Sequence, residues 1–222
     1  MDLIEIKGGN HLEGEIKISG SKNASLPMMI ASLLTKEKVE LDNIPNLSDV
    51  LTLLELMKNL GAKFEFKKNQ DSSYKLITQM EKIVSNEASY NLVRKMRASF
   101  WVLAPLILRY GEAKVSLPGG CAIGTRPINF YLSILESMGT TIKLKDGYVL
   151  ASIKNQLKPI NFKLNFPSVG VTHFFLMMAS LVEGKSVIKN AAKEPEVIFL
   201  ANMLSKMGAK ISGQGTNKIT VI

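Results

Sequence analysis

The sequence predicts an α/β fold built from three repeated units, with apolar helices buried together and sheets on the outside. Apolar residues recur at helical spacing in several segments that end at a glycine, and short alternating segments between them are typical of strands. The chain also repeats itself, because Leu60-Gly61-Ala62-Lys63 corresponds to Met207-Gly208-Ala209-Lys210, and Ala31-Ser32-Leu33 corresponds to Ala179-Ser180-Leu181. Met138-Gly139-Thr140 indicates a looser middle copy.

The first unit is predicted from the helical and alternating patterns before residue 80. Ser48 or Asp49 is expected to cap its second helix and Gly61 to end that helix. The expected elements are two short strands within Leu3–Ser19, a helix over about Leu26–Leu34 with Pro27 in its first turn, a strand at Val39–Leu41, the second helix, and a hairpin of Ala62–Phe66 with Tyr74–Thr78.

The second and third units follow the same plan. A long helix is expected over about Tyr90–Tyr110, kinked or divided at Pro105, with Arg94 and Arg97 one turn apart on one face. Lys145-Asp146-Gly147 marks a hairpin turn. The other expected elements are strands at Lys114–Leu117, Thr141–Leu144, Tyr148–Ser152 and Ser186–Lys189, helices over Pro127–Met138, Ser168–Val182 and about 195–207, and strands to Ile222.

The amino-acid composition limits the classes of protein to which this chain can belong. The 222 residues suffice for one large domain or two small ones, and 46% of them are hydrophobic, as in ordinary globular proteins. No apolar run approaches a membrane span, and the acidic, alternating N-terminus does not resemble a signal peptide. A single cysteine excludes an internal disulfide framework, so a reducing cytoplasm is expected. With two histidines and one cysteine, we expect no metal cluster and no cofactor.

The formal net charge of +9 comes mainly from lysines spread along the chain, which indicates a solvated basic surface. No dense basic run is interleaved with aromatic residues, and no zinc-finger or RNP pattern occurs, so nucleic acid is not an expected partner. Arginine is rare: the four are Arg94, Arg97, Arg109 and Arg126. Three of them lie in or beside the motifs below, where bidentate recognition of anions would use them.

The only cysteine, Cys121, lies in a glycine-rich loop that runs from Leu117 to Pro127. One interpretation is a turn that contains a small, inert thiol, which is the usual state of a free cysteine. The other is a candidate acid or nucleophile, because Arg126 and the helix start expected at Pro127 would supply positive potential.

A second candidate site precedes the first helix. Lys22 and Asn23 precede its expected N-terminus, where free backbone N–H groups can bind an anion. The GxxxxGK[ST] spacing of a P-loop is absent. A lysine before a helix is also commonly a solvated surface residue.

Together these motifs resemble the UDP-N-acetylglucosamine 1-carboxyvinyltransferases, a branch of the enolpyruvyl transferase family that opens bacterial peptidoglycan synthesis. The resemblance covers the whole chain. The matching segments are Gly20-Ser21-Lys22-Asn23-Ala24, Arg94-Lys95-Met96-Arg97-Ala98-Ser99, Leu117-Pro118-Gly119-Gly120-Cys121 through Arg126-Pro127, Ser168-Val169-Gly170, Glu194-Pro195-Glu196, and Gly208-Ala209-Lys210-Ile211-Ser212-Gly213-Gln214-Gly215-Thr216. The family's fold consists of two inside-out α/β domains of three repeats each, which suits the predicted repeat.

The resemblance also implies a reaction. The sugar 3-hydroxyl adds to C2 of phosphoenolpyruvate while C3 is protonated, and elimination of phosphate leaves an enolpyruvyl ether. Cys121 matches the loop cysteine regarded as the proton donor. Lys22, Asn23, Arg97 and Arg126 match residues that bind phosphoenolpyruvate, and Asn23, Arg97 and Arg126 also match UDP-sugar contacts. The remaining matches to UDP-sugar contacts are Pro127, Ile128, Asn129, Phe130, Ser168, Val169 and Gly170.

Two departures from the family pattern stand out. Phe166 occupies a position that is commonly a lysine near the nucleotide, a charge that Lys163 could supply instead. Family members are also about twice as long. Residues 1–20 are therefore expected to form strands that in the family join a second domain, residues 21–222 to form the three-repeat domain, and the second half, with its general base and further arginines, to be needed for activity.

Other functions remain open at this point. The shikimate-pathway enolpyruvyl transferase shares the fold, although the Pro-Gly-Gly-Cys loop argues against it. A non-catalytic module that binds a nucleotide sugar or another anion would keep the fold without the chemistry.

Overall fold

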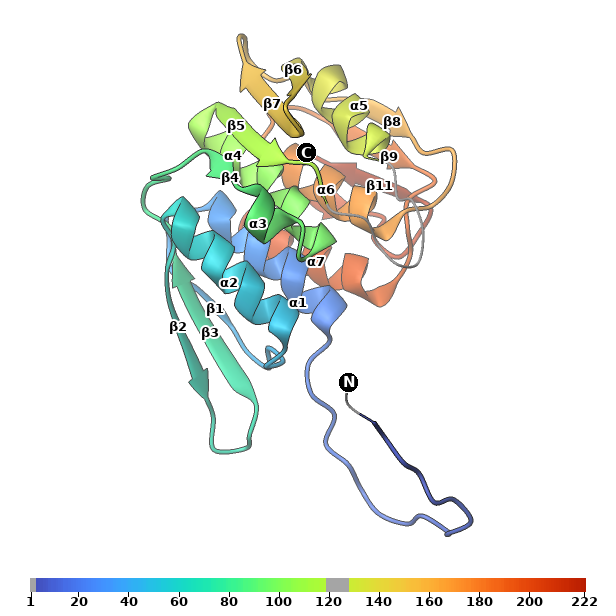
Figure 1. Cartoon of the computed structure of the whole chain (residues 1–222). Coiled ribbons are helices and arrows are strands. Elements are labelled where there is room, and N and C mark those ends of the chain that lie inside the picture. The colour runs from blue at the N-terminus through green and yellow to red at the C-terminus, as the bar shows by residue number, and fades with distance from the viewer. Residues whose placement is uncertain (1–2, 119–127) are drawn as a thin grey trace.

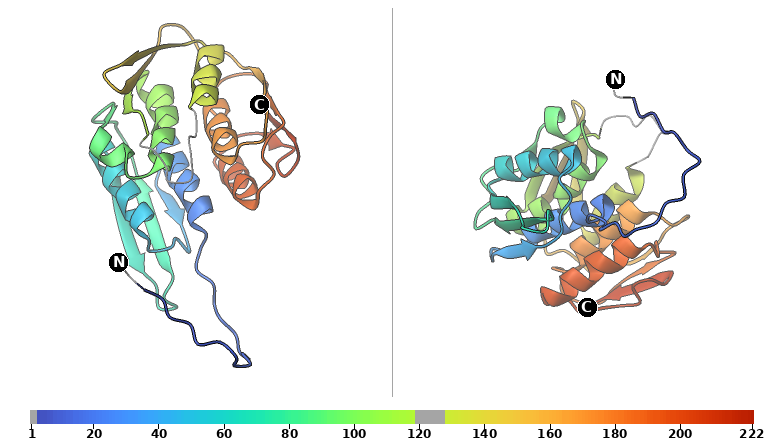
Figure 2. Two further views of the ribbon diagram at one scale, coloured as in Figure 1. Left: turned by 45° about the vertical axis from the view of Figure 1, so that its right-hand side comes forward. Right: turned by 90° about the horizontal axis from the view of Figure 1, so that it is seen from below.

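The computed structural model describes residues 3–118 and 128–222. The described residues form three sheets, and each sheet lies on the outside of a central group of helices (Figures 1 and 2). This arrangement confirms the predicted α/β class with apolar helices inside and sheets outside. None of the helices among the described residues is long and apolar enough to cross a bilayer.

The first unit begins where the chain leaves its extended N-terminal segment. Its three strands form an antiparallel sheet in the order β1-β3-β2, which confirms the predicted hairpin. The elements are α1 (Lys22–Ala31), the short 3₁₀ helix η1 (Ser32–Leu34), β1 (Val39–Leu41), α2 (Ser48–Leu60), β2 (Lys63–Lys68) and β3 (Tyr74–Gln79).

The second unit forms a four-stranded sheet in the order β4-β5-β7-β6. Asp146 and Gly147 make the predicted tight turn between β6 and β7. The elements are β4 (Glu87–Ala88), α3 (Tyr90–Val93), the 3₁₀ helix η2 (Arg97–Val102), α4 (Leu103–Tyr110), β5 (Glu112–Ser116), α5 (Asn129–Met138), β6 (Thr140–Lys145) and β7 (Tyr148–Ile153).

The third unit also forms a four-stranded sheet, in the order β10-β11-β9-β8, with β8 and β9 parallel. Its sheet lies on the opposite side of the helices from that of the first unit (Figure 2). The elements are β8 (Asn161–Lys163), α6 (Val169–Ala179), β9 (Ser186–Lys189), α7 (Pro195–Lys206), β10 (Ile211–Ser212) and β11 (Lys218–Val221).

One apolar helix from each unit lies at the centre. Every residue of α6 from Val171 to Ala179 is buried, and α6 packs against α4 and α7 while α1 packs against α2 and α7. A helix that is apolar all round must be enclosed by other elements, because any exposed side would leave hydrocarbon in water. The core therefore holds the N-terminal ends of these helices in place for the site described below.

The long helix expected over 90–110 does not form. Met96 has an extended backbone, with φ −151° and ψ 126°, which separates α3 from η2. Val93, Met96 and Phe100 are all buried, so their spacing resembled that of one continuous helix. Pro105 does not cause the break, because it lies in the first turn of α4, where a missing N–H is tolerated. Arg94 and Arg97 therefore do not share a helix face.

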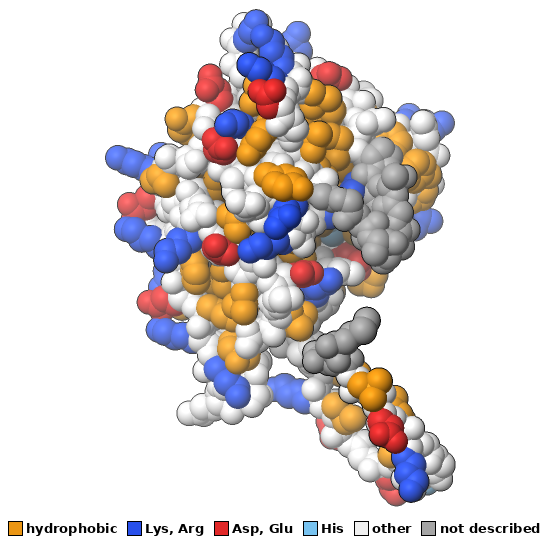
Figure 3. Space-filling model, in the orientation of Figure 1, with side chains coloured by type: hydrophobic (Ala, Val, Ile, Leu, Met, Phe, Trp, Pro, Cys, Tyr) orange, Lys and Arg blue, Asp and Glu red, His pale blue; other side chains and the backbone are white. Residues whose placement is uncertain are grey.

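The two strands expected within 3–19 are also absent, and the segment extends away from the body (Figure 1). Leu3, Ile6 and Ile16 are each more than 80% exposed. A strand needs a hydrogen-bonded neighbour, and no described strand pairs with this segment. Lys17 forms an ion pair with Asp71 in the β2–β3 turn. Figure 3 shows hydrophobic side chains gathered along the segment.

Candidate functional site

A cavity of about 690 Å³ opens where several helices begin. Residues of the first turns of α1, α2, α6 and α7 line it, and so does the start of η2. Helix N-termini carry unpaired N–H groups and a partial positive charge, so their convergence favours an anionic ligand. The lining residues are Lys22, Asn23, Leu26, Asp49, Lys95, Met96, Arg97, Ala98, Trp101, Phe130, Tyr131, Phe166, Ser168, Val169, Gly170, Val171, His173 and Glu196.

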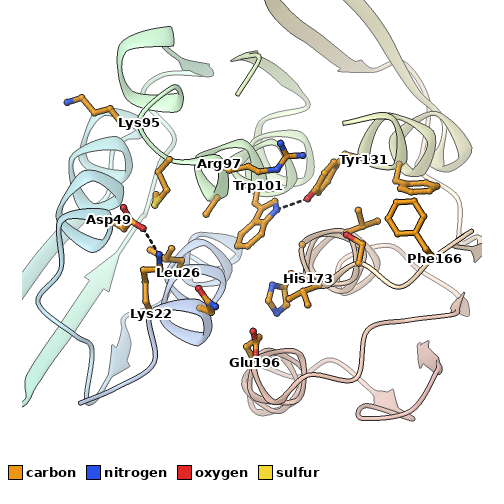
Figure 4. A pocket seen from close by; sticks show the side chains of 18 residues that line it. Lys22, Leu26, Asp49, Lys95, Arg97, Trp101, Tyr131, Phe166, His173 and Glu196 are labelled. Atoms are coloured by element: carbon orange, nitrogen blue, oxygen red, sulfur yellow. Dashed lines mark hydrogen bonds and ion pairs between the residues drawn. The ribbon is translucent and has the colours of Figure 1, made fainter. Parts of the chain in front are cut away.

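Lys22 is the first residue of α1, whose N-cap is Ser21, so the helix begins about four residues earlier than expected and Pro27 lies inside it and not in its first turn. The Ser21 hydroxyl accepts a hydrogen bond from the Ala24 N–H at 3.4 Å, as an N-cap residue should. The Lys22 Nζ lies 3.0 Å from the Asp49 Oδ2, and their side chains are 45% and 32% exposed (Figure 4). Asp49 was expected as a possible helix cap, but Leu47 is the N-cap of α2 and makes no side-chain cap bond. The carboxylate of Asp49 instead holds Lys22 at the cavity.

The turn that leads into α1 has no room for a side chain. The Gly20 N–H donates to the Asn43 Oδ1 at 3.1 Å. A Cβ added to Gly20 would lie 1.7 Å from the Asn43 carbonyl oxygen, so only glycine fits this close approach. The contact between Gly20 and Asn43 therefore determines where Lys22 and Asn23 begin the helix.

Aromatic side chains form the opposite part of the cavity. The Trp101 Nε1–H donates to the Tyr131 hydroxyl at 3.3 Å, and the Trp101 ring meets the His173 ring edge to face at 5.4 Å (Figure 4). Phe130 and Phe166 make a second edge-to-face pair at 5.3 Å, and Phe166 is 54% exposed. Such faces suit the flat or apolar part of a ligand.

The charges of the described lining are mixed. Lys22, Lys95 and Arg97 are cationic, while Asp49 and Glu196 are anionic. Both acids lie in the first turn of a helix, where the helix dipole stabilises a carboxylate. With the helix N-termini added, the cavity favours a ligand that carries several negative charges.

His173 is fully buried at the cavity wall. Burial lowers the pKa of His173 from 6.5 to about 4, because the charged imidazolium would lose its hydration, and the backbone of Glu196 partly opposes this shift. His173 is therefore neutral at physiological pH.

The structure brings most of the predicted binding residues together. Lys22, Asn23, Arg97 and Phe130 line the cavity, and Ser168, Val169 and Gly170 join them from the start of α6. Ile128 and Asn129 precede or begin α5 without lining the cavity. Ile128 packs against the core and Asn129 is exposed. Cys121, Arg126 and Pro127 lie outside the described residues.

The lining residues that the sequence did not identify as members of a site include Asp49, Trp101, Tyr131 and His173. The sequence pattern marks Asp49 only as a candidate helix cap, and it indicates no site role for Tyr131, Trp101 or His173. The one available signal was composition, because Trp101 is the only tryptophan and His173 one of two histidines. Lys163, expected as a possible substitute for the charge missing at Phe166, lies on β8 and does not line the cavity.

Within residues 3–118 and 128–222, no group of three or more His, Cys, Asp or Glu side chains could hold a metal ion. The described cavity lining carries ammonium, guanidinium, carboxylate, imidazole, hydroxyl and amide groups.

Comparison with known proteins places this chain in a family. Residues 6–222 match the protein-family model described as EPSP synthase (3-phosphoshikimate 1-carboxyvinyltransferase). The chain belongs to the EPSP synthase family. Its solved structural relatives in that fold include the enolpyruvyl transferase NikO from Streptomyces tendae, with a TM-score of 0.81 and 21% identity over 96% of this chain and 49% of that one. EPSP synthase from Acinetobacter baumannii aligns with a TM-score of 0.69 and 18% identity over 94% of this chain and 46% of that one.

Curated relatives of this EPSP synthase family member are closer in sequence. The UDP-N-acetylglucosamine 1-carboxyvinyltransferase of Chelativorans sp. (strain BNC1) is 50% identical over 226 aligned residues, which cover 100% of this chain and 53% of that protein. The protein of the same name from Xanthobacter autotrophicus is 51% identical, with the same coverage. The chain therefore spans about half the length of the curated relatives it matches.

Proposed function

We propose that this chain supplies the UDP-sugar-binding half of a UDP-N-acetylglucosamine 1-carboxyvinyltransferase, which transfers the enolpyruvyl group of phosphoenolpyruvate to the sugar 3-hydroxyl in peptidoglycan synthesis. The main support for the proposal is a sequence identity of about 50%, along the whole chain, to relatives of that name. The solved EPSP synthase shares only 18% of its aligned residues, so the shikimate substrate is less well supported.

The chemistry of the cavity supports two polyanionic substrates. Lys22 and Arg97 lie at the cavity with the N-termini of four helices, and such groups offset the repulsion between two phosphorylated molecules. We assign Lys22, Asn23 and Arg97 to the anionic groups near the reacting centre. Phe130, Phe166 and the start of α6 at Ser168 are assigned to the nucleotide.

The reaction proceeds by addition and elimination. The sugar oxygen bonds to C2 of phosphoenolpyruvate, C3 gains a proton, and the hydroxyl proton leaves to a base. Elimination then breaks the bond from C2 to the phosphate oxygen and removes a proton from C3, which restores the double bond. We assign the proton donor to Cys121, which lies outside the described residues, and assign Arg126 and Pro127 of the same loop to substrate binding.

The activity is proposed for this domain together with a second domain, since the relatives are about twice as long. The test measures phosphate release from phosphoenolpyruvate with UDP-N-acetylglucosamine, using the chain alone and the chain mixed with the separately produced second half of a relative. Turnover only in the mixture, abolished by Cys121→Ala, is the expected result. Fosfomycin, a small epoxide that mimics phosphate, should block the same thiol.

Matched arginine variants test the assignment of the cavity. Arg97→Gln removes a guanidinium at the cavity, whereas Arg94→Gln removes one that lies over the Tyr90 ring away from it. Loss of UDP-sugar binding in Arg97→Gln alone supports the site, and equal binding in both variants contradicts it. If the assembled protein prefers shikimate 3-phosphate as the acceptor, the result would instead support the activity of the shikimate-pathway enolpyruvyl transferase.

A second candidate function is a non-catalytic module that binds a nucleotide sugar. The observation that favours it is that the described cavity, with its helix N-termini and its aromatic pair, belongs to this chain alone. This candidate predicts binding of UDP-N-acetylglucosamine by calorimetry with no phosphate release, even after the second half is added.

A further inference from the structure

Trp101 occupies the middle of the cavity. Figure 4 shows its indole between the Lys22–Asp49 pair on one side and Tyr131 and Phe166 on the other. A ligand that reaches from Lys22 to the aromatic rings of Tyr131 and Phe166 must pass the indole of Trp101. The angle of the indole therefore determines the shape of the site.

Two helices other than its own hold the indole. From α5, the Tyr131 hydroxyl accepts the hydrogen bond of the indole N–H. From α6, the backbone of Gly170 approaches directly, because a Cβ there would lie 3.1 Å from Trp101 Cζ2 and 2.6 Å from the Tyr131 hydroxyl. Any larger residue at Gly170 would displace one ring or the other.

His173 makes the third contact. It follows Gly170 by three residues and therefore lies on the same face of α6. Its ring meets the indole at 80°, with the centroids 5.4 Å apart. The side chain is 0% exposed, and neither ring nitrogen makes a hydrogen bond of normal geometry among the described residues, although the backbone of Glu196 lies close enough to favour the charged ring. A leucine would fill this space without the cost of burying two unpaired polar atoms, so filling volume alone does not account for an imidazole here.

We propose that His173 is a positioning residue, whose neutral imidazole packs edge to face against Trp101 and fixes the indole in the wall of the substrate cavity. The identity of the ligand rests on the proposed function, but the contact between the two rings does not. His173 acts on the substrate only through Trp101, because its own atoms are shielded.

The neutral state of His173 agrees with its surroundings. The charged groups that line the cavity with it are Glu196 on α7, Lys22 on α1 with its partner Asp49 on α2, Arg97 on η2, and Lys95, which lies between α3 and η2. In Figure 4 Glu196 lies beside His173 on the same side of the cavity. Burial outweighs the opposing effect of the Glu196 backbone, since the pKa of His173 falls to about 4 rather than rising.

The test uses the fluorescence of Trp101, which reports on the site alone because the chain has no other tryptophan. His173→Leu keeps the volume but removes the ring edge, His173→Phe keeps a ring, and His11→Leu changes the exposed histidine as a control. Acrylamide quenching of Trp101 should increase in His173→Leu, while His173→Phe and His11→Leu should match the original chain. Circular dichroism checks that each variant is folded.

Binding and turnover give a second readout. An aromatic pair of this kind corresponds to about a two- to ten-fold change in a binding constant, so the dissociation constant for UDP-N-acetylglucosamine should rise by that factor in His173→Leu and recover in His173→Phe. In the mixture with the second half, KM should rise and kcat should change less than two-fold.

Two results would overturn the proposal. One is a folded His173→Leu variant with unchanged quenching, and the other is equal quenching in His173→Leu and His173→Phe, which would mean that the ring edge is not what holds Trp101. If the original chain binds no UDP-sugar, the proposed function fails, while the quenching experiment still decides the role of His173.

Discussion

The Nζ of Lys22, at the start of α1, lies 3.0 Å from the Oδ2 of Asp49, at the start of α2. Both residues line the cavity, so the ion pair joins two helix N-termini where an anionic ligand is expected. Without Asp49, the flexible lysine side chain would sample many rotamers. The carboxylate therefore limits where the ammonium group can meet a substrate.

The first prediction concerns this ion pair. Asp49→Asn should lower kcat/KM of the assembled enzyme about ten-fold, because Lys22 loses the partner that orients it. Since both side chains are about a third or more exposed, the free energy of unfolding should change by less than about 1 kcal/mol. Steady-state kinetics and thermal unfolding measure the two effects. Glu40→Gln, which removes a surface partner of Lys75, is the control and should leave kcat/KM unchanged.

The second prediction concerns the pH dependence of stability. The pKa of His173 is about 4 in the folded chain and 6.5 when unfolded, so the unfolded state binds more protons between these values. The free energy of unfolding should therefore be highest above pH 6.5 and fall as the pH drops to 4, by on the order of 3 kcal/mol from this residue. Urea unfolding at several pH values should show a shallower fall for His173→Leu. Equal slopes in both proteins would contradict the prediction.

The third prediction concerns the rim of the cavity at Phe166. Phe166→Lys places a cation near the start of α6, so UDP-sugar binding should tighten several-fold at low ionic strength, and the gain should disappear near 1 M salt. Calorimetry across a salt series measures this. Phe199→Lys is a matched control, because Phe199 is 56% exposed against 54% for Phe166 and does not line the cavity. The same salt response in both variants would contradict the assignment of Phe166 to the binding site.

The fourth prediction concerns Arg109, which stabilises the fold away from the cavity. Its guanidinium donates to four backbone carbonyls, at distances of 2.7 to 3.2 Å, and so joins α4 to two loops of the first unit. The accepting carbonyls belong to Leu33, Thr35, Met80 and Glu81. Arg109→Met should lower the free energy of unfolding by about 2–4 kcal/mol.

Chemical denaturation tests this role of Arg109. Arg94→Met, at an arginine that is exposed and lies over the Tyr90 ring, should change stability by less than about 0.5 kcal/mol. A similar loss in both variants would mean that the carbonyl contacts of Arg109 contribute little.

The fifth prediction concerns Gly20. Gly20→Ala would bring a Cβ within 1.7 Å of the Asn43 carbonyl oxygen, so the start of α1 must move and carry Lys22 with it. The free energy of unfolding should fall by about 1–3 kcal/mol, and UDP-sugar binding should weaken. Gly8→Ala, where no atom lies within 4 Å of the added Cβ, should change neither quantity. Unaltered binding in a folded Gly20→Ala variant would contradict the prediction.

Local signals in the sequence were sufficient to predict most elements and part of the site. The β6–β7 turn at Asp146-Gly147 and the helix ends at Gly61 and Gly139 formed where expected, because these residues act through their own backbone. The helix start at Ser168 was found for a similar reason, whereas α1 begins at Lys22 and not near Leu26 as expected. The spacing of apolar residues gave a wrong prediction around Met96. The extended backbone of Met96 divides the expected helix, although the apolar pattern continues through it.

The sequence by itself determined the α/β class, the three-unit repeat and the helix start at Ser168, because hydrophobic periodicity and turn chemistry depend on neighbouring residues. Only the tertiary structure decided that Asp49 pairs with Lys22 and that His173 packs against Trp101. These partners lie on different helices, 27 and 72 positions apart, so packing alone brings them together. The same reason applies to residues 3–19, whose alternating pattern produces a strand only where another strand supplies hydrogen bonds.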